Sequence, residues 1–280
     1  MWINYIHQFH LMNVDYKMTS YHGGKQRIGK RIAQKIVDIS IEMFYDGNMD
    51  EIKGYCEPFS GMLGVYRHIP VLFEDEGFED LRYLAGDTNG SVIAMWKKVT
   101  LEARKGRTWK PPVTVSEKEY NIMKRDGRDT ADKGFVGHQY SFGGQFFHGY
   151  GPKYGKTASA YQNASKRVND IADELNDVKF SKGNYKQFSK LKQFVIYCDP
   201  PYVNTECCYG RESAFDNDEF WDWVQEMAKS NIVFVSNYNA PKGTEVVFKS
   251  DHRLTGFKSA KKRSRSERLY LVKPSRNRRR

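Results

Sequence analysis

Long hydrophobic runs and metal-binding patterns are missing from this 280-residue chain. No apolar run reaches the roughly 18 residues of a transmembrane helix. Residues 1–20 have no basic start, unbroken apolar block or small-residue cleavage site, which argues against a secretory signal. The four cysteines form no CxxC pair, and the seven histidines form no HExxH motif. We therefore expect a soluble, cytoplasmic protein with reduced thiols, no membrane contact and no metal site.

Excess positive charge is concentrated near the C-terminus. Residues 258–280 contain eleven of the 45 Lys and Arg residues but one of the 34 Asp and Glu residues. They supply +10 of the formal net charge of +11, so the rest of the chain is nearly neutral. A basic segment of this kind is either a solvated tail or a contact for nucleic-acid phosphates.

Apolar segments alternate along the chain in a way that predicts an α/β fold. Helical spacing predicts a helix over 27–48, with Gly47 as its stop, and a capped helix over 215–229. A short strand and a glycine loop are expected in 53–66, and a strand ending at Asp87 precedes a helix from about Asn89. Further strands are expected at 194–199 and 231–238, and a last strand at the end of 258–272. Repeated strand–helix order predicts a largely parallel sheet covered on both faces.

Residues 104–156 differ in composition from both flanking parts of the chain. They are rich in Gly, Lys, Arg and aromatic residues and have no clear helical period, which returns only in 157–175. An inserted subdomain is the prediction. Its stretch SFGGQFFHGY (141–150) is typical of a tight hairpin, although interleaved basic and aromatic residues are also used by nucleic-acid surfaces.

Two glycine motifs do not support nucleotide hydrolysis or dinucleotide binding. GKQRIGKR (24–31) has the spacing of a phosphate-binding loop, but Arg31 stands where a Ser or Thr must reach magnesium. GMLGVY (61–66) lacks the third-glycine spacing of a dinucleotide fingerprint. It indicates only a close approach of the backbone to a ligand.

Three acidic residues, Glu57, Asp87 and Asp199, fall at or near predicted strand ends. Ligands of open α/β sheets bind beyond the carboxyl ends of the strands, so the three are expected to share one site. No paired-carboxylate spacing for water activation is present. A reagent that arrives already activated fits better, and a sulfonium methyl donor needs neither a metal nor an enzyme nucleophile.

The sequence DPPY (199–202) fits the acceptor side of such a transfer. The Asp199 carboxylate and the Pro200 carbonyl, which Pro201 helps to fix, could accept both N–H bonds of an exocyclic amine and localise its lone pair. The Tyr202 ring could stack on the base, which is worth about 1–3 kcal/mol. In duplex DNA the base must first be flipped out of the stack.

These motifs resemble those of the Dam-like DNA adenine N6-methyltransferases, and in detail those of phage-encoded members. The resemblance runs from about Tyr21 to Val272 and rests on YHGGK (21–25), CEPFSGMLGVY (56–66), AGDTN (85–89), GNY (183–185) and DPPY. GNY departs from the family pattern, because Asn184 stands where an acid is often found. The resemblance implies an α/β, Rossmann-like class I methyltransferase fold with a mostly parallel sheet and an inserted target-recognition subdomain.

The resemblance also implies S-adenosyl-L-methionine as cofactor and double-stranded DNA as partner, with a monomer as the expected state. We expect a catalytic domain over 18–103 and 166–273, a recognition insertion over 104–165, an N-terminal extension over 1–17 and a basic tail over 274–280. The expected catalytic residues are those of DPPY. The expected cofactor contacts are Tyr21, Lys25, Glu57, Phe59, Asp87, Tyr185 and Asp199, and the expected DNA contacts are Lys261, Lys262, Arg263 and Arg265.

Two alternatives stay open at this point. The enzyme could act on RNA, on cytosine N4 or on a protein amide, since the insertion argues for DNA only by analogy. The chain could also be a nucleic-acid binder without catalytic activity. Intact Tyr21, Lys25, Asp87 and Asp199 argue against this second alternative.

Overall fold

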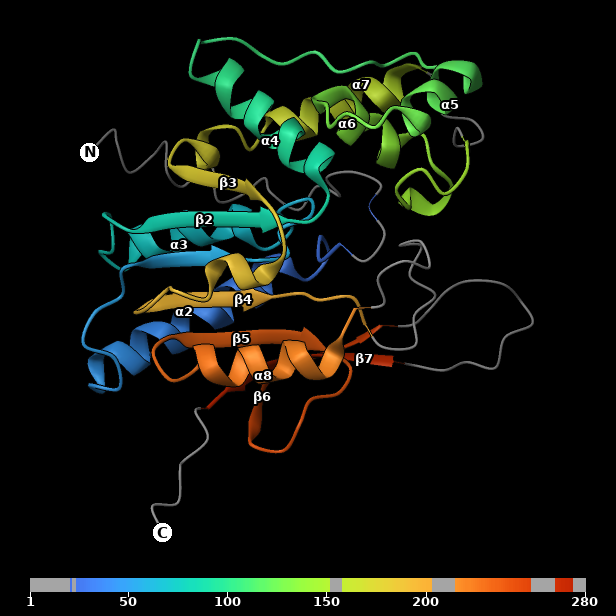
Figure 1. Ribbon diagram of the computed structural model, residues 1–280. Helices are drawn as coiled ribbons and strands as arrows, with labels where there is room; N and C mark the ends of the chain where they lie inside the picture. The colour runs from blue at the N-terminus through green and yellow to red at the C-terminus, as the bar shows by residue number, and fades with distance from the viewer. Residues whose placement is uncertain (1–20, 22–23, 152–157, 203–214, 253–264, 274–280) are drawn as a thin grey trace.

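A seven-stranded sheet forms the centre of the molecule, with the strand order β3-β2-β1-β4-β5-β7-β6. The computed structural model describes residues 21, 24–151, 158–202, 215–252 and 265–273 (Figure 1). Neighbouring strands from β3 to β5 are parallel, and β7 runs antiparallel between β5 and β6. The strands are β1 (Gly54–Glu57), β2 (Arg82–Asp87), β3 (Val178–Lys182), β4 (Phe194–Cys198), β5 (Ile232–Asn237), β6 (Thr244–His252) and β7 (Arg265–Val272).

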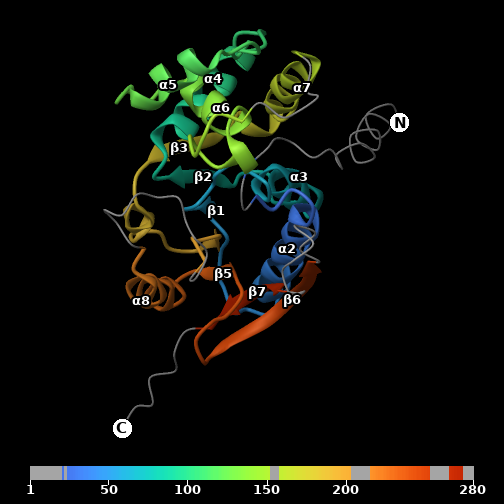
Figure 2. The ribbon, with the colours of Figure 1, turned by 90° about the vertical axis from the view of Figure 1, so that its right-hand side faces the viewer.

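Helices cover both faces of this sheet, as the view onto its edge shows (Figure 2). Helix α8 (Asn217–Met227) lies on one face, and α2 (Gly29–Tyr45) and α3 (Ile69–Asp75) lie on the other. Strands β1, β4 and β5 are therefore buried at every position, which explains the largely apolar sequences of β4 and β5. The α/β architecture with a mostly parallel, Rossmann-like sheet confirms the expected class I methyltransferase fold.

Local sequence signals set the ends of the predicted helices as expected. Helix α2 buries Ile32 and Ile36, and Gly47 follows it with a φ of +70°, a conformation that favours glycine. Asn89 caps α4 (Gly90–Ala103) by accepting hydrogen bonds from two backbone amides. Asp216 caps α8 in the same way by accepting from the Glu219 amide.

Regular helices form within 104–156, although the sequence of this segment has no clear helical period. Helices α5 (Glu117–Arg125) and α6 (Ala131–Gln139) lie there, followed by α7 (Ala158–Asn169), and together they form a helical layer beside α4 at one end of the sheet (Figure 1). Helix α6 is short and contains two glycines, so it shows little apolar period. Gly134 is needed for packing, since a Cβ there would lie 2.3 Å from the Ser91 carbonyl oxygen of α4.

The expected hairpin in 141–150 is reduced to one antiparallel bridge between Ser141 and Tyr150. A 3-10 turn, η2 (Phe142–Gly144), occupies the rest of its first half. The other 3-10 turns are η1 (Tyr66–His68), η3 (Asp173–Leu175) and η4 (Tyr185–Phe188). The Phe142 side chain is 71% exposed, so this loop presents an aromatic ring to solvent.

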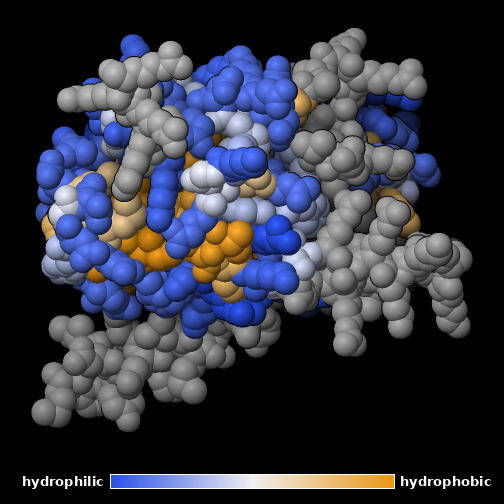
Figure 3. Space-filling model, turned by 90° about the horizontal axis from the view of Figure 1, so that it is seen from below, coloured by the Kyte–Doolittle hydropathy of each residue, from blue (hydrophilic) through white to orange (hydrophobic). Residues whose placement is uncertain are grey.

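The last strand, β7, was predicted, whereas the two edge strands β3 and β6 were not. Both lie at an edge of the sheet, where polar and charged side chains interrupt the apolar pattern. The face seen from the β6 side has an apolar area within a hydrophilic surface (Figure 3). Val246 of β6 is 48% exposed, and Val247 and Phe248 are half-buried.

Cys56 and Cys198, on neighbouring strands, are both buried free thiols. Among the elements that the structure describes, no helix combines the length and the apolar character needed to cross a membrane.

Candidate active site

The three strand-end acids lie at one edge of the sheet. Glu57 ends β1, Asp87 ends β2 and Asp199 directly follows β4. Strand β1 is the parallel neighbour of both β2 and β4, so the three carboxyl ends are adjacent. The placement expected from the sequence is therefore found, with Glu57 between the two aspartates.

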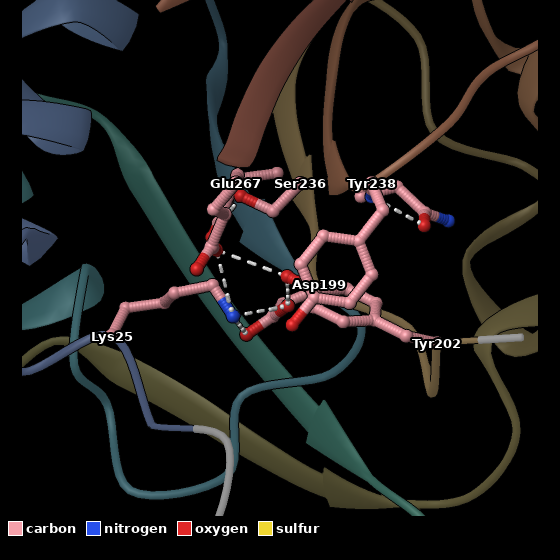
Figure 4. Close-up of polar contacts among 8 residues, drawn as sticks. Lys25, Asp199, Tyr202, Ser236, Tyr238 and Glu267 are labelled. Carbon is pink, nitrogen blue, oxygen red and sulfur yellow. Dashed lines mark hydrogen bonds and ion pairs between the residues drawn. The ribbon is translucent and has the colours of Figure 1, made fainter. Parts of the chain in front are cut away.

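Lys25 is brought to Asp199 by a close contact between its own segment and the glycine loop after β1. A Cβ on Gly29 would lie 1.9 Å from the Gly64 carbonyl oxygen, so only glycine allows the start of α2 to approach this loop. The Lys25 ammonium then lies 2.7 and 2.6 Å from the two carboxylate oxygens of Asp199 (Figure 4). It also lies 3.1 Å from Oε1 of Glu267 on β7.

Tyr202 completes this cluster from the other side. Its hydroxyl lies 3.0 Å from Asp199 Oδ1 and 3.0 Å from Glu267 Oε1, and it can donate its single hydrogen to either carboxylate (Figure 4). Its ring packs edge-on against Tyr238 at 4.6 Å between centroids, and the Lys25 ammonium lies 5.0 Å from its centre. Lys25, Asp199, Tyr202 and Glu267 are called the carboxylate pair cluster below.

Burial governs the protonation of the carboxylate pair cluster. Burial raises the pKa of Asp199, and the neighbouring Glu267 charge raises it further, while Lys25 acts in the opposite direction. For Lys25, burial lowers the pKa, but Asp199 and Glu267 outweigh it and hold the pKa above its ordinary value. The Lys25 ammonium therefore stays charged beside the Asp199 and Glu267 carboxyl groups.

Asp87 is held by the backbone instead of by side chains. Its Oδ1 accepts from the Asn89 amide at 2.8 Å, and its Oδ2 accepts from the Gly61 amide at 3.0 Å. Burial raises the pKa of Asp87, and these two hydrogen bonds oppose that shift. Asp87 thus fixes the glycine loop to the end of β2, while Asn89 is the N-cap of α4.

Tyr21 lies against the same glycine loop. Gly61 has a φ of +44°, and a Cβ at this position would lie 2.6 Å from the Tyr21 hydroxyl. The Tyr21 ring also packs on His138 of α6, with 4.8 Å between centroids. Tyr21 therefore connects the glycine loop to the helical layer that contains the expected insertion.

Glu57 is almost completely buried, with 2% of its surface exposed. Burial raises the pKa of its carboxyl group to about 8, although a hydrogen bond from the Tyr55 hydroxyl at 2.7 Å opposes the shift. Glu57 is consequently protonated near neutral pH. It places no negative charge beside Asp199, and its expected role toward a cofactor stays a prediction.

Phe59 and Tyr185 stack on each other beyond the end of β1, with 5.6 Å between centroids. Phe220 of α8 packs edge-on against both rings. The side chain of Asn184 accepts a hydrogen bond from the Lys186 amide and begins η4. The two rings are thus part of an aromatic cluster, and their expected contact with a cofactor stays a prediction.

Two residues of this site were missed in the sequence, Glu267 and Tyr238. Asn237 of β5 pairs with Arg268 of β7, so Tyr238 and Glu267 each lie one residue beyond this pair at the same edge. Glu267 is the single acidic residue in the basic segment 258–280, and this contrast in charge was the signal in the sequence that could have marked it as a site residue. Its contact with Lys25 depends on the antiparallel insertion of β7, which no local pattern encodes.

The expected DNA contacts Lys261, Lys262 and Arg263, like the N-terminal extension 1–17 and the basic tail, lie outside the described residues. Arg265 begins β7, and its side chain is also outside the description. Within the part of the chain that the structure describes, no group of His, Cys, Asp and Glu side chains could hold a metal ion.

Comparisons with known proteins give structural likenesses alone. No family model and no curated protein sequence matches the chain. The rRNA methyltransferase aviRa from Streptomyces viridochromogenes is 11% identical over 84% of each chain, with a TM-score of 0.28. SMU.472, described as a methyltransferase and complexed with SAH, is 10% identical over 80% of this chain and 48% of its own, with a TM-score of 0.30. The fold class rests on the strand order given above.

Proposed function

We propose that the protein transfers a methyl group from S-adenosyl-L-methionine to the N6 amine of a flipped adenine in duplex DNA. The observation that carries this proposal is the position of Asp199. Its carboxylate follows the central strand β4, directly before two prolines and Tyr202, and it is turned toward Lys25 at the sheet edge. This is where open α/β sheets bind their ligands.

The cofactor fits the half of the site formed by the loop after β1 and by the end of β2. The Ser60 hydroxyl and the Tyr185 hydroxyl are both buried and have no hydrogen-bond partner within the described residues. Such orphaned groups are expected where a polar ligand completes the site. Asp87, Phe59 and Tyr21 adjoin the same loop and would hold the cofactor with them. S-Adenosylmethionine would supply a methyl group made electrophilic by its positive sulfur.

Asp199 and Pro200 would hold the acceptor amine. With its two N–H bonds directed at the Asp199 carboxylate and the Pro200 carbonyl, the amine has its lone pair turned out of the ring plane toward the methyl group. The carboxylate also stabilises the positive charge that develops on nitrogen. Lys25 and Tyr202 now occupy the Asp199 oxygens, so an incoming amine must share or replace their hydrogen bonds.

The helical layer and the C-terminal basic residues would bind the DNA. Helix α5 presents Lys124 and Arg125 to solvent beside Ile122, which is 60% exposed, and Phe142 is exposed on the neighbouring loop. Basic side chains neutralise phosphates, while exposed apolar rings stack on or wedge between bases. We assign target recognition to residues 104–165 and backbone contact to Lys261, Lys262, Arg263, Arg265 and the tail.

Incubation with radiolabelled S-adenosylmethionine and either duplex DNA or RNA tests the proposal. We expect label in N6-methyladenine of duplex DNA, and labelling at least about 10²–10³-fold slower with Asp199→Asn. Label in cytosine N4, RNA or protein would support an enzyme with a different acceptor. DNA retention without label would indicate a binding protein.

A further inference from the structure

The carboxylate pair cluster contains one acid more than the proposed methyl transfer needs for holding the amine. Glu267 lies across from Asp199, with the Lys25 ammonium and the Tyr202 hydroxyl between the two carboxyl groups (Figure 4). Glu267 is 8% exposed, so its charge is largely removed from water. A second buried carboxylate beside Asp199 raises the free energy of the fully ionised site, and it therefore calls for a functional explanation.

The position of the Tyr202 hydroxyl gives that explanation. It lies 3.0 Å from both Asp199 Oδ1 and Glu267 Oε1, but it carries one hydrogen and can donate to one of them at a time. The other oxygen contact becomes a hydrogen bond only when that carboxyl group carries a proton. Asp199 Oδ1, the Tyr202 hydroxyl oxygen and Glu267 Oε1 therefore form a continuous chain of hydrogen bonds once the cluster has taken up one additional proton.

The proposed reaction produces such a proton. When the amine nitrogen bonds to the methyl carbon and the carbon–sulfur bond breaks, the nitrogen becomes a cation that still carries both hydrogens. One of them must leave before the product is a neutral methylamine. Asp199 would be in contact with that nitrogen, so it is the first acceptor.

We propose that Glu267 takes this proton through Tyr202. The proton moves from the amine nitrogen to Asp199 Oδ1, the Asp199 proton then moves to the Tyr202 oxygen, and the Tyr202 hydrogen moves to Glu267 Oε1. Asp199 is ionised again, Tyr202 is unchanged and Glu267 is neutral until it exchanges with water after product release. This inference rests on the proposed function, and in it Glu267 is a positioning residue that acts through Asp199.

Lys25 holds the two carboxyl groups of this hydrogen-bond chain in position. Its ammonium lies 2.7 Å from Asp199 Oδ1, 2.6 Å from Asp199 Oδ2 and 3.1 Å from Glu267 Oε1, so it holds both carboxyl groups beside the Tyr202 hydroxyl. Among the described residues, the other titratable groups that interact with the pair are Tyr197 and Cys198 of β4 and Glu57 of β1. Glu57 is protonated near neutral pH, and Tyr197 and Cys198 stay neutral because burial raises their pKa values, so none of the three competes as an acceptor.

The test is the pH dependence of single-turnover methyl transfer to duplex DNA, measured from about pH 5 to about pH 9. Glu267→Gln keeps the shape and hydrogen bonding of the side chain but removes the acceptor. We expect the rate near neutral pH to fall by about tenfold to a hundredfold. The acid limb should move to lower pH by about one unit or more, because Asp199 loses a neighbouring negative charge.

Two further variants separate a proton path from a merely structural contact. Tyr202→Phe keeps the ring but removes the bridging hydroxyl, so it should lower the transfer rate by a similar factor. The double variant with Glu267→Gln and Tyr202→Phe should be little slower than either single variant. Glu245→Gln on β6 is the matched control. Glu245 makes an ion pair with Lys273 at 2.6 Å, remote from the cluster in sheet register, and its loss should leave the profile unchanged.

The outcomes distinguish this inference from the proposed function. Transfer by the wild-type protein with an acid limb that Glu267→Gln does not move would overturn the proton path alone. Losses that add in the double variant would do the same. No transfer by the wild-type protein to duplex DNA would overturn the proposed function and the proton path together.

Discussion

Asp87 and Asp199 lie at the same edge of the sheet, two strands apart, but they are held in different ways. Asp87 accepts hydrogen bonds from the backbone amides of Gly61 and Asn89. Asp199 contacts the side chains of Lys25 and Tyr202. Backbone amides cannot leave without unfolding the loop, whereas an ammonium and a phenol can exchange one acceptor for another.

This difference separates a binding group from a reacting group. A carboxylate fixed by amides keeps one geometry, which suits a group that orients a cofactor through every step. A carboxylate held by mobile side chains can give up a hydrogen bond to an incoming amine and regain it after product release. The two halves of the site should therefore respond differently when their aspartates are changed.

Asp199→Asn should have the largest effect. The variant keeps the shape of the side chain but loses the charge that stabilises the developing ammonium, so the rate of methyl transfer should fall by at least about 10²–10³-fold. Affinity for S-adenosylmethionine should fall much less, because the lost interaction acts mainly in the transition state. Single-turnover rates and equilibrium binding of the cofactor measure the two quantities. Equal losses in both would place Asp199 with Asp87 as a binding group.

Asp87→Asn should show the opposite pattern with a smaller effect. An amide nitrogen would face one of the two backbone amides that now donate to Asp87, so one hydrogen bond is lost and the Gly61 loop is loosened. We expect about tenfold weaker cofactor binding, equivalent to about 1.4 kcal/mol, and a lower midpoint of thermal unfolding. The transfer rate at saturating cofactor should change less than the affinity. A slow rate with unchanged affinity would remove the distinction between the two aspartates.

The sequence specified Asp199 and Asp87 better than it specified their surroundings. Asp87 ends β2, Asp199 directly follows β4, and the carboxyl ends of parallel strands meet at one edge, so their placement followed from local pattern and topology. Glu267 could not be placed in this way, because its contact with Lys25 spans most of the chain and depends on β7 entering antiparallel between β5 and β6.

The same contrast holds for the fold. Strands β1, β4 and β5 are buried on both faces, and their composition identified them. Strands β3 and β6 lie at the edges, where solvent permits polar side chains and the apolar pattern fades. Helix α6 was not predicted because Gly134 and Gly137 lower its helix propensity. Both glycines are needed for close packing, since a Cβ at either position would clash with a neighbouring residue.

Glu57 lies between the two aspartates and provides a pH-dependent test of the electrostatics at this edge. Its pKa is about 8 in the folded protein, against an ordinary value of 4.5, so from about pH 4.5 to about pH 8 the folded state holds a proton that the unfolded state has released. This group's contribution to the free energy of unfolding is therefore highest below pH 4.5. It declines as the pH rises, by up to about 1.4 kcal/mol per pH unit.

Glu57→Gln should remove that part of the pH dependence, because Gln can still accept the Tyr55 hydrogen bond but does not titrate. Urea unfolding of both proteins at several pH values measures the difference. The variant should gain stability relative to the wild type as the pH rises toward 8. A difference that stays constant would show that Glu57 is ionised in the folded state and contributes negative charge beside Asp199.

Phe142→Ala should have the smallest effect and should leave the functions of Asp87 and Asp199 unchanged. The ring is 71% exposed on the loop between α6 and α7, outside the sheet edge, so its removal costs little folding free energy. If the ring stacks on or wedges between bases, its loss should weaken DNA binding by about 1 kcal/mol, or about fivefold. Cofactor affinity should stay unchanged.

Fluorescence anisotropy with labelled duplex DNA measures the DNA affinity. Lys118→Ala, at an exposed lysine of α5, controls for the loss of charge alone. Unchanged DNA affinity for Phe142→Ala would leave the contact with bases to other parts of the helical layer.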